Sequence, residues 1–583
     1  MPEVRAPGVY FEPAEQRVPP LSLAPSGVPI FLGVTRRGPL DRPVRIHNRA
    51  RFTEVFGEWV SGSYLGAAVR GFFDNGGESC FVLRVARVSG EEGEERATAA
   101  SLELLDRGGA PTLRVSAQDA GTWGNHIRVT LQAHDEVRTI LTRDAMAGER
   151  SLQVKSTHGL AAGTRVRLYD GENEQWTVVQ AVDRKSVSLR HPLIYDFASA
   201  APSYLGAHDF SLTVADLDRS ETFAHVALNG ASPRYVERVV AEQSRLVRIV
   251  ALRPRTDPGQ ARPMEVSSVA LQGGADGLDD LGPDDFIGHD RGPGDRRGLT
   301  GLITHEQGDL LVMPDLMWAY QRSQRFRSLR DVEAVQDAAI TVCERSGMRV
   351  ALLDPPPDVD FQETLRWRRQ FDSPYAALYF PWLVVLDGGR RRSVPPCGHV
   401  AGVIARSDKE YGVHKAPANE VVEGIVDLDI LLQDAHLAML NEAGINCTRA
   451  FGARGLRIWG ARTCSSNPEW RYLNVRRVVS SIAAAIEAGT QWAVFESNGP
   501  GLWKRVSRLV VAFLATLRER GMLVGDTPED AFFVQCDAET NPPGDVDRGM
   551  LVSRIGIAVT RPVEFIVFRL SQRLEDQAQS DEE

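Results

Sequence analysis

Two short stretches of the sequence hold residue types that could do chemistry. In "VPPCGHVAG", Cys397 lies two residues before His399, and a thiol beside an imidazole could form a Cys–His nucleophile pair. In "DGGRRRS", two glycines precede Arg390, Arg391 and Arg392, a combination that could bind a phosphate group; solvated arginines in a surface hairpin are the simpler interpretation. Because no convergent set of acid, base and nucleophile accompanies either stretch, no catalytic residue is predicted.

Sequence motifs for bound groups are missing as well. The chain has no GxxxxGK[ST], GxGxxG, HExxH or GxSxG motif, which argues against the common nucleotide, zinc and serine-hydrolase sites. "YDGENEQW" places acidic residues in a turn without the EF-hand spacing. The six cysteines are scattered and form no CxxC pair, so we expect reduced core thiols, no metal and no cofactor.

Size and charge narrow the class of protein. A chain of 583 residues should contain several domains. The formal net charge of −10 argues against direct binding of nucleic acid or an anionic membrane. The sequence shows no apolar run long enough for a membrane span or a signal peptide, so we expect synthesis and assembly in the cytoplasm.

Both ends of the chain are extended and apolar. Residues 1–29 contain seven prolines together with the apolar runs "GVYF" and "LSL", which predicts an extended arm because helices do not persist through prolines. "VEFIVFRLS", at 563–571, is a β-favouring run followed only by an acidic tail. Such an uncovered strand is an aggregation hazard unless another strand pairs with it. Strand addition between copies would provide that partner and would build rings or helices, so the ends predict a polymer-forming structural protein.

The segment between the ends changes character along its length. Residues 65–87 predict a helix, a glycine turn and a strand, while residues 97–275 consist of short alternating runs that predict a mostly-β insertion with one helix. Residues 300–460 alternate buried-type strands with helices, which predicts a mixed sheet covered by helices. Further along, Trp503, Val506, Val510, Phe513 and Leu517 form a helical stripe that should be buried, with Gly521 as its stop.

Long motifs make the chain resemble contractile tail sheath proteins, those of contractile phage tails and related contractile injection systems. The amino-terminal "VRAPGVYFEP" and "GVPIFLGVTRRGP" are similar to the arm and first core strand of that family. The second half has the more extensive resemblance, through "VQDAAITVCERSGMRVALLDPP", "VPPCGHVAGVIARSDKEYGVHKAPANE", "LNEAGINCTRAFGARGLRIWGARTCSSNPEWRYLNVRR" and "IGIAVTRPVEFIVFRL". Residues 130–270 match only loosely, so their role stays open.

The resemblance implies a fold and a mechanism. The fold class is mixed α/β (α+β) multidomain: an α/β sheath core and C-terminal domain, an inserted mostly-β domain, and extended N- and C-terminal arms. Copies would stack as hexameric rings in a helical array around an inner tube protein, with baseplate and tail terminator or cap proteins at the ends. Contraction would drive the tube through a target envelope without a nucleotide. The particle would be a phage tail or a tail-like particle that can be released from the cell.

The resemblance also gives roles to particular residues. The carboxy-terminal strand that joins subunits would use Val563, Phe565, Ile566, Val567, Phe568, Arg569 and Leu570. The amino-terminal arm would make its contacts through Val4, Val9, Tyr10 and Phe11, unless it folds back on its own core. Lys504, Arg505 and Arg508 would face the tube, with ring-to-ring salt bridges as the alternative. Trp459, Arg462, Trp470, Arg471 and Arg476 are interpreted as carboxy-terminal core and buried polar support.

We expect six consecutive segments along the chain. They are an arm (1–27), the first segment of the core sheath domain (28–92), an inserted β-rich outer domain (93–280), the second segment of the core sheath domain (281–425), a tube-facing carboxy-terminal domain (426–560), and a linker strand with an acidic tail (561–583). Two other interpretations stay open at this point. One is an α/β, hydrolase-like enzyme with a β accessory domain, and the other is a non-contractile tube or surface-layer subunit.

Overall fold

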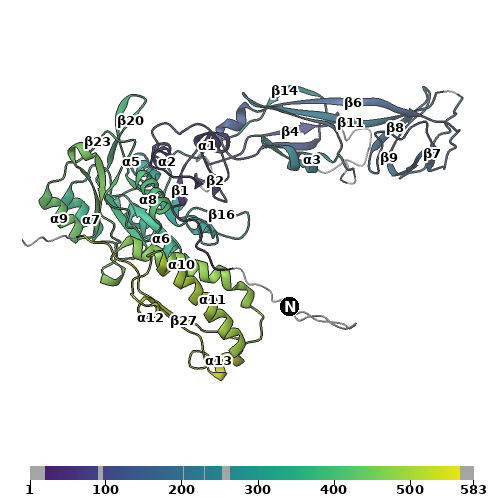
Figure 1. Cartoon of the computed structure of the whole chain (residues 1–583). Coiled ribbons are helices and arrows are strands. Elements are labelled where there is room, and N and C mark those ends of the chain that lie inside the picture. The colour runs from purple at the N-terminus through teal and green to yellow at the C-terminus, as the bar shows by residue number, and fades with distance from the viewer. Residues whose placement is uncertain are drawn as a thin grey trace, which may run out of the picture.

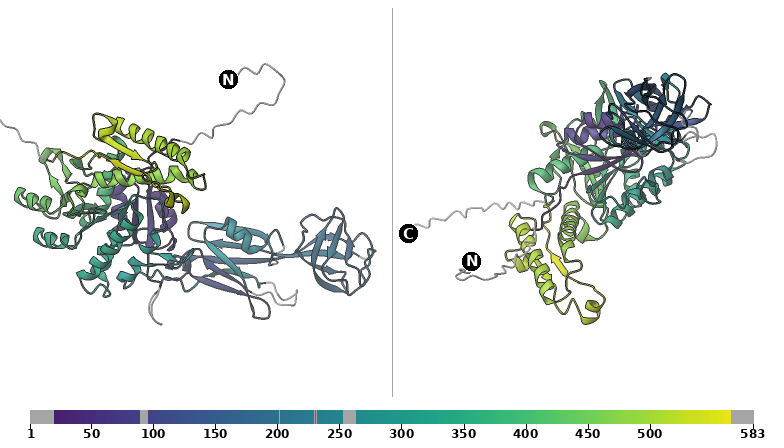
Figure 2. Two further views of the ribbon diagram at one scale, coloured as in Figure 1. Left: turned by 90° about the horizontal axis from the view of Figure 1, so that it is seen from below. Right: turned by 90° about the vertical axis from the view of Figure 1, so that its right-hand side faces the viewer.

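A central α/β body carries two projecting parts (Figure 1). The computed structural model describes residues 20–88, 96–200, 202–228, 230, 232–252 and 263–564. An elongated β-rich insertion extends from one side of the body, and a helical carboxy-terminal domain packs against another side. The perpendicular views show the insertion ending in a separate distal lobe, away from the helical domain (Figure 2). The molecule is therefore mixed α and β throughout, as the sequence predicts.

A nine-stranded mixed sheet forms the centre of the body. Its strand order is β2-β3-β1-β17-β18-β19-β24-β25-β22. The pairs from β3 through β24 are parallel, and antiparallel strands lie at both margins. The strands are β1 (Pro29–Val34), β2 (Val44–Ile46), β3 (Cys80–Val85), β17 (Leu310–Val312), β18 (Val350–Leu353), β19 (Ala376–Phe380), β22 (Glu420–Val421), β24 (Ile445–Ala450) and β25 (Leu456–Trp459).

Helices supply the apolar surface that buries this sheet. They are α1 (Arg49–Phe56), α2 (Leu65–Asp74), α4 (Pro283–Ile287), α5 (Pro314–Arg322), α6 (Leu329–Ser346), α7 (Phe361–Arg368), α8 (Cys397–Tyr411) and α9 (Asp434–Glu442). Local signals set the ends of α6: Ser328 forms a capping box, and Gly347 ends the helix in the left-handed conformation. Helices α2 and α8 approach so closely that a Cβ at Gly402 would lie 2.5 Å from the Phe72 carbonyl oxygen.

The insertion is built from two sheets and contains two hydrophobic clusters. A three-stranded sheet near the body consists of β4 (Ser101–Leu105), β5 (Pro111–Ala117) and β13 (Val247–Ala251), with α3 (Val236–Gln243) packed on it. The larger sheet consists of β6 (Arg128–Ile140), β7 (Ser151–Gln153), β8 (Arg165–Tyr169), β9 (Glu174–Val182), β10 (Ser186–Leu189), β11 (Tyr204–Ala215), β12 (Ser220–Val226) and β14 (Val266–Ala270).

The carboxy-terminal domain has its own small core. Its elements are α10 (Leu473–Thr490), α11 (Pro500–Glu519), α12 (Pro528–Ala531), β26 (Phe532–Gln535), α13 (Pro543–Asp547) and β27 (Arg554–Ile557). The stripe predicted on α11, from Trp503 to Leu517, is buried in this core. Gly521 follows the C-cap with φ of 74°, which confirms its role as the helix stop. The Asn75–Gly77 turn between α2 and β3 is also confirmed.

Three sequence interpretations are settled by these elements. Arg390 and Arg391 lie in a surface hairpin of β20 (Leu383–Asp387) and β21 (Arg390–Val394), as the simpler interpretation held. The apolar run "HVAGVIARSD", which follows the strand-like "AALYFPWLVVLD", predicts a further strand, but it forms α8 because "CGHVAGVIA" buries helical faces between α2 and the sheet. The run "LDILLQDAHLAMLNEAG" predicts a helix from Leu428, but α9 begins only at Asp434, because Leu428 pairs with β20 in the short strand β23 (Asp427–Leu428).

Candidate assembly surfaces

A two-stranded sheet lies at the edge of the carboxy-terminal domain. Strands β26 and β27 pair antiparallel, with Phe532 opposite Ile557, and neither has a second strand neighbour within the described portion of the chain. Phe532 is buried in the core around α11, whereas Phe533 is 54% exposed and lies against Gly556. The outer edges of β26 and β27 therefore have no strand partner within the described residues.

The amino-terminal arm enters the body through a charged junction. Leu21 and Leu23 pack against the carboxy-terminal core before the chain reaches β1. The Asp309 carboxylate then accepts the backbone N–H groups of Gly27 (3.0 Å) and Val28 (2.7 Å) and a bond from Arg477 of α10 (2.7 Å). Asp309 therefore joins the arm, the central sheet and the carboxy-terminal domain. The predicted contacts at Val4, Val9, Tyr10 and Phe11 lie outside the described residues.

At the other end, Glu564 is the last described residue. Its carboxylate pairs with the Arg462 guanidinium, which confirms the interpretation of Arg462 as buried polar support. Val563 is 78% exposed, so the described residues leave most of its side chain uncovered. The remaining residues predicted for the joining strand, Phe565, Ile566, Val567, Phe568, Arg569 and Leu570, lie outside the described residues.

The polar face of α11 differs from residue to residue. Arg505 is already occupied, because it pairs with Glu496 at 2.7 Å and stacks over Trp492. Lys504 and Arg508 are exposed, and neither pairs with a carboxylate among the residues that the structure describes. Arg508 donates instead to the Lys504 carbonyl oxygen at 3.2 Å. The two side chains that remain available to an acidic partner are therefore Lys504 and Arg508.

The other predicted support residues divide into two groups. Arg476 is buried between aromatic rings, 4.6 Å from the Tyr375 centroid and 4.3 Å from that of half-buried Trp470. The prediction was wrong for Trp459, which is 41% exposed, and for exposed Arg471. Trp459 lies on β25, next to the short margin strand β22. Sequence analysis did not single out Asp309 or Glu564, because their partners are distant in sequence.

Neither candidate for chemistry forms a reactive site. Cys397 and His399 are fully or almost fully buried at the start of α8, where substrate has no access. Burial raises the pKa of the Cys397 thiol well above its usual value and lowers the pKa of His399 to about 4. Both shifts favour the neutral forms, so the pair does not supply a thiolate. All six cysteines are free and buried, as core thiols should be.

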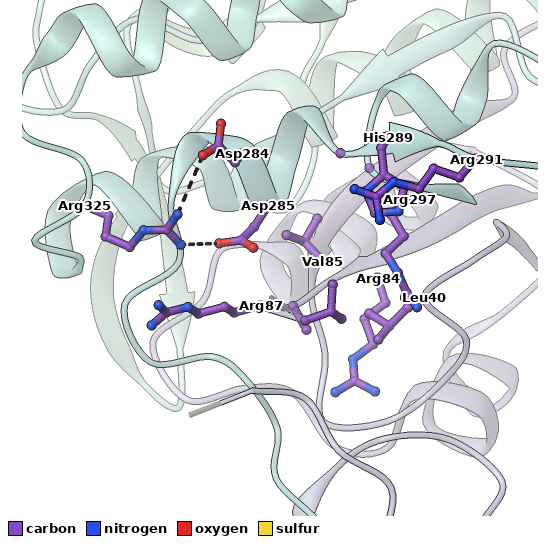
Figure 3. A pocket seen from close by; sticks show the side chains of 14 residues that line it. Leu40, Arg84, Val85, Arg87, Asp284, Asp285, His289, Arg291, Arg297 and Arg325 are labelled. Carbon is purple, nitrogen blue, oxygen red and sulfur yellow. Dashed lines mark hydrogen bonds and ion pairs between the residues drawn. The ribbon is translucent and has the colours of Figure 1, made fainter. Parts of the chain in front are cut away.

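Five arginines are among the fourteen residues that line the cavity beside the root of the insertion (Figure 3). It has a volume of about 560 Å³, and its two carboxylates, Asp284 and Asp285, both face Arg325. His289 is hydrogen-bonded to Asp295 at 2.9 Å. The lining contains no Ser, Thr, Cys or Lys, so no nucleophile accompanies the His–Asp pair.

Neither a metal-binding cluster nor a membrane-spanning helix occurs in the described ranges. No cluster of three or more His, Cys, Asp or Glu side chains there could hold a metal ion. No described helix combines the length and the apolar character that a bilayer span needs. The features that remain as functional candidates are the open hairpin, the two charged junctions and the basic face of α11.

Comparison with known families matches two consecutive domains to this region of the chain. The phage tail sheath protein central domain matches residues 329–464, and the phage tail sheath C-terminal domain matches residues 465–573. The chain therefore contains two phage tail sheath domains, which together span residues 329–573. The hairpin, Arg462, Glu564 and the α11 face all lie inside these two sheath domains.

Individual sheath proteins give the same result at moderate identity. A prophage major tail sheath protein of Pseudomonas aeruginosa is 26% identical over 292 residues, which is 49% of this chain and 71% of the relative. The tail sheath protein of Escherichia phage P2 is 26% identical over 181 residues, 30% of this chain and 43% of that protein. The chain thus spans less than half of the P2 sheath protein.

Solved sheath structures share the whole fold. The anti-feeding prophage helical sheath in its contracted state has a TM-score of 0.52 at 19% identity, covering 98% of this chain and 99% of that chain. The sheath complex of the extracellular contractile injection system PVC, also contracted, has a TM-score of 0.51 at 19% identity and covers 98% of both chains. The sheath fold therefore includes the inserted domain, which the two family domains do not reach.

Proposed function

We propose that this chain is the structural subunit of a contractile sheath. Copies polymerise as a helical stack of hexameric rings around an inner tube, and contraction of the stack drives the tube through a target envelope. The observation that carries the proposal is the open β26–β27 hairpin, which lies in the region matched by the sheath C-terminal domain. The names of the related structures, which specify contracted sheaths of injection systems, support the contractile character.

The hairpin and the two arms are complementary in chemistry. The hairpin offers unpaired strand edges and exposed Phe533, while both arms consist of extended, β-favouring sequence. Strand addition would give main-chain hydrogen bonds for affinity and alternating side chains for register. In this arrangement Val4, Val9, Tyr10 and Phe11 of one copy and the residues from Phe565 to Leu570 of another pair with the hairpin of a third. Such heterologous contacts build rings where the rotation closes and helical arrays where it does not.

Contraction on this plan is a change of packing between rigid subunits. Bistable interfaces let many small contacts switch together between two arrangements. Each arm is covalently part of its own subunit and pairs non-covalently with a neighbouring subunit. The network of subunits therefore stays connected while the subunit bodies rotate. Energy stored when the extended sheath assembles is released when the contracted contacts form, and no nucleotide is consumed.

The basic face of α11 is the proposed contact with the inner tube. Lys504 and Arg508 present two positive charges that have no carboxylate partner within the described residues. An acidic stripe on the tube would complement them, with a contribution that weakens in salt. Arg505 supports this face through its stacking on Trp492 rather than by direct contact.

Further partners follow from the same proposal. Baseplate and terminator or cap proteins would hold the two ends of the stack, with no direct contact to nucleic acid or membrane. Assembly would take place in the cytoplasm, as part of a phage tail or of a tail-like particle that is later released. One solved relative named for a baseplate, that of the anti-feeding prophage in its contracted state, shares the fold with a TM-score of 0.53 at 18% identity.

Electron microscopy of two variants tests the strand exchange. The full-length protein, incubated with its purified tube and baseplate, should form striated sheaths in negative stain. A truncation that ends at Glu564 should remain a folded monomer and form none. Phe533→Lys, on the acceptor hairpin, should also abolish the sheaths. Leu217→Lys is the matched control, because Leu217 is 81% exposed on the insertion and should tolerate the change.

Sheaths from the truncated protein would contradict the proposed joining strand. Sheaths from Phe533→Lys as abundant as those from Leu217→Lys would contradict the hairpin as acceptor. If the full-length protein formed no sheath on its own tube and baseplate, the structural function itself would be wrong.

A further inference from the structure

We propose that Arg462 and Glu564 form the anchor from which the carboxy-terminal connection leaves the subunit. The inference rests on the proposed strand exchange and adds to it the residues that fix the exit point. It assigns a positioning role to Glu564, the one acidic residue within the apolar run "VEFIVF".

The contact between the two side chains is bidentate. Arg462 Nε donates to Glu564 Oε1 at 2.9 Å, and Nη2 donates to Oε2. Tyr472 adds a longer hydroxyl contact to Oε2 at 3.4 Å. The side chains are only 9% and 18% exposed, so the pair is largely shielded from water and its two parallel bonds hold one orientation.

Arg462 is itself held rigidly by the central sheet. Asn446 of β24 accepts the Arg462 backbone N–H at 2.6 Å and donates to the Arg462 carbonyl oxygen at 2.8 Å. The same Asn446 amide donates to the Leu378 carbonyl oxygen of β19 at 3.2 Å. The remaining Arg462 nitrogen, Nη1, donates to the Asn441 carbonyl oxygen at the end of α9, at 2.6 Å. The guanidinium is therefore in place before Glu564 arrives.

The chain reaches this anchor from a second fixed point in the helical domain. Thr560 donates through its backbone N–H to the Met522 carbonyl oxygen at 3.2 Å and through Oγ1 to that of Gly521 at 2.9 Å. Asn474 donates to the Thr560 carbonyl oxygen at 3.1 Å. Four residues later, Glu564 binds the central sheet. Pro562 stands just before the β-favouring run, a position that suggests a hinge. It lies between two held residues, Thr560 and Glu564, so the pivot belongs after Glu564.

A fixed exit point matters for assembly because it sets the effective concentration of the joining strand at the neighbouring hairpin. Effective concentration falls as the free segment between the body and the binding strand lengthens. Release of Glu564 would return the free segment to Thr560, and it would also remove the fixed direction of exit. The anchor thus acts on a second copy of this chain through geometry, without touching it.

The test uses full-length protein with its tube and baseplate. Glu564→Ala removes both bonds, Glu564→Gln keeps the shape without the charge, and Glu442→Gln is the control. Glu442 is an exposed acid at the end of α9 with no ion pair within the described residues. Two readouts are needed: anisotropy of a dye attached through Ser571→Cys, which reports the anchor in the monomer, and the critical concentration for sheath assembly.

The expected result is faster local rotation of the dye and a critical concentration raised about threefold in Glu564→Ala, since each doubling of the free segment costs about 0.6 kcal/mol. Glu564→Gln should fall between, and Glu442→Gln should match the wild type. Unchanged anisotropy in Glu564→Ala would overturn the anchor. Faster rotation with unchanged assembly would overturn its role. If the wild type formed no sheath, the proposed function would be wrong. The role of the anchor in assembly would then be wrong too, even if the anisotropy showed that Glu564 is held in the monomer.

Discussion

The buried pair between α10 and α8 allows the sharpest test of the fold. Arg477 is 2% exposed and donates to Asp408, which is 3% exposed, and to Asp309. The bonds to Asp408 Oδ1 and Asp309 Oδ2 are 2.8 and 2.7 Å long. Burial opposes the positive charge, but attraction by the two carboxylates outweighs it and raises the pKa of Arg477. Removing the arginine would leave two carboxylates facing each other with little water.

The expected loss follows from that geometry. Breaking a buried ion pair from one side costs about 3–5 kcal/mol, because the charge that remains has no partner. Arg477→Met should therefore destabilise the contact between the central sheet and the carboxy-terminal domain by about this amount. Adding Asp408→Asn removes one of the orphaned charges, so the double variant should be less destabilised than the sum of the single variants, by about 2 kcal/mol.

Urea denaturation followed by tryptophan fluorescence measures these differences. Arg505→Met is the control, because the Arg505–Glu496 pair is 47% and 42% exposed and such pairs contribute less than about 1 kcal/mol. The reasoning would be refuted if Arg477→Met cost no more than Arg505→Met, or if the effects of Arg477→Met and Asp408→Asn were additive.

Three further predictions concern other regions of the molecule. Burial raises the pKa of Asp354 to about 7, so the folded state keeps a proton that the unfolded state releases near pH 4, and stability falls as pH rises from 4 to 7. Asp354→Asn should remove a fall of about 3 kcal/mol between pH 5 and pH 8, as measured by denaturation at the two pH values. Gly402→Ala should destabilise by about 1–3 kcal/mol in the same assay, because the steric cost against the Phe72 carbonyl exceeds the gain of about 1 kcal/mol in helix propensity; a more stable variant would contradict the close packing. Lys504→Glu with Arg508→Glu should weaken tube binding at low salt in co-sedimentation while sheath strands still join, and equal binding would exclude this face from the tube contact.

Periodicity and end signals made much of this structure predictable. The buried stripe of α11, the capping of α6 and the alternation of strands and helices all follow from local patterns. Apolar runs at element boundaries were harder to assign to a strand or a helix, because the same residues suit both until their neighbours in the fold are known. Leu428 illustrates this, since its pairing with β20 starts α9 six residues late.

The charged junctions were not predictable in the same way. Asp309 binds residues more than 160 positions away in both directions, and Glu564 binds Arg462 at a separation of 102 residues. No local spacing marks such pairs, since only the folded sheet brings them together. Exposure at a sheet margin was missed for the same reason, as Trp459 shows.

The positions of the two junctions define a line of force through the subunit. Asp309 immediately precedes β17, and Asn446, which holds Arg462, is the second residue of β24. These strands are parallel, with β18 and β19 between them. The two junctions therefore lie at the amino-terminal ends of their strands, on the same side of the sheet and roughly 14 Å apart. A force that pulls the amino-terminal arm against the carboxy-terminal arm would be transmitted through the hydrogen bonds between β17, β18, β19 and β24. The insertion projects away from that strip (Figure 1), so its size and sequence could change without weakening the mechanical link between neighbouring subunits.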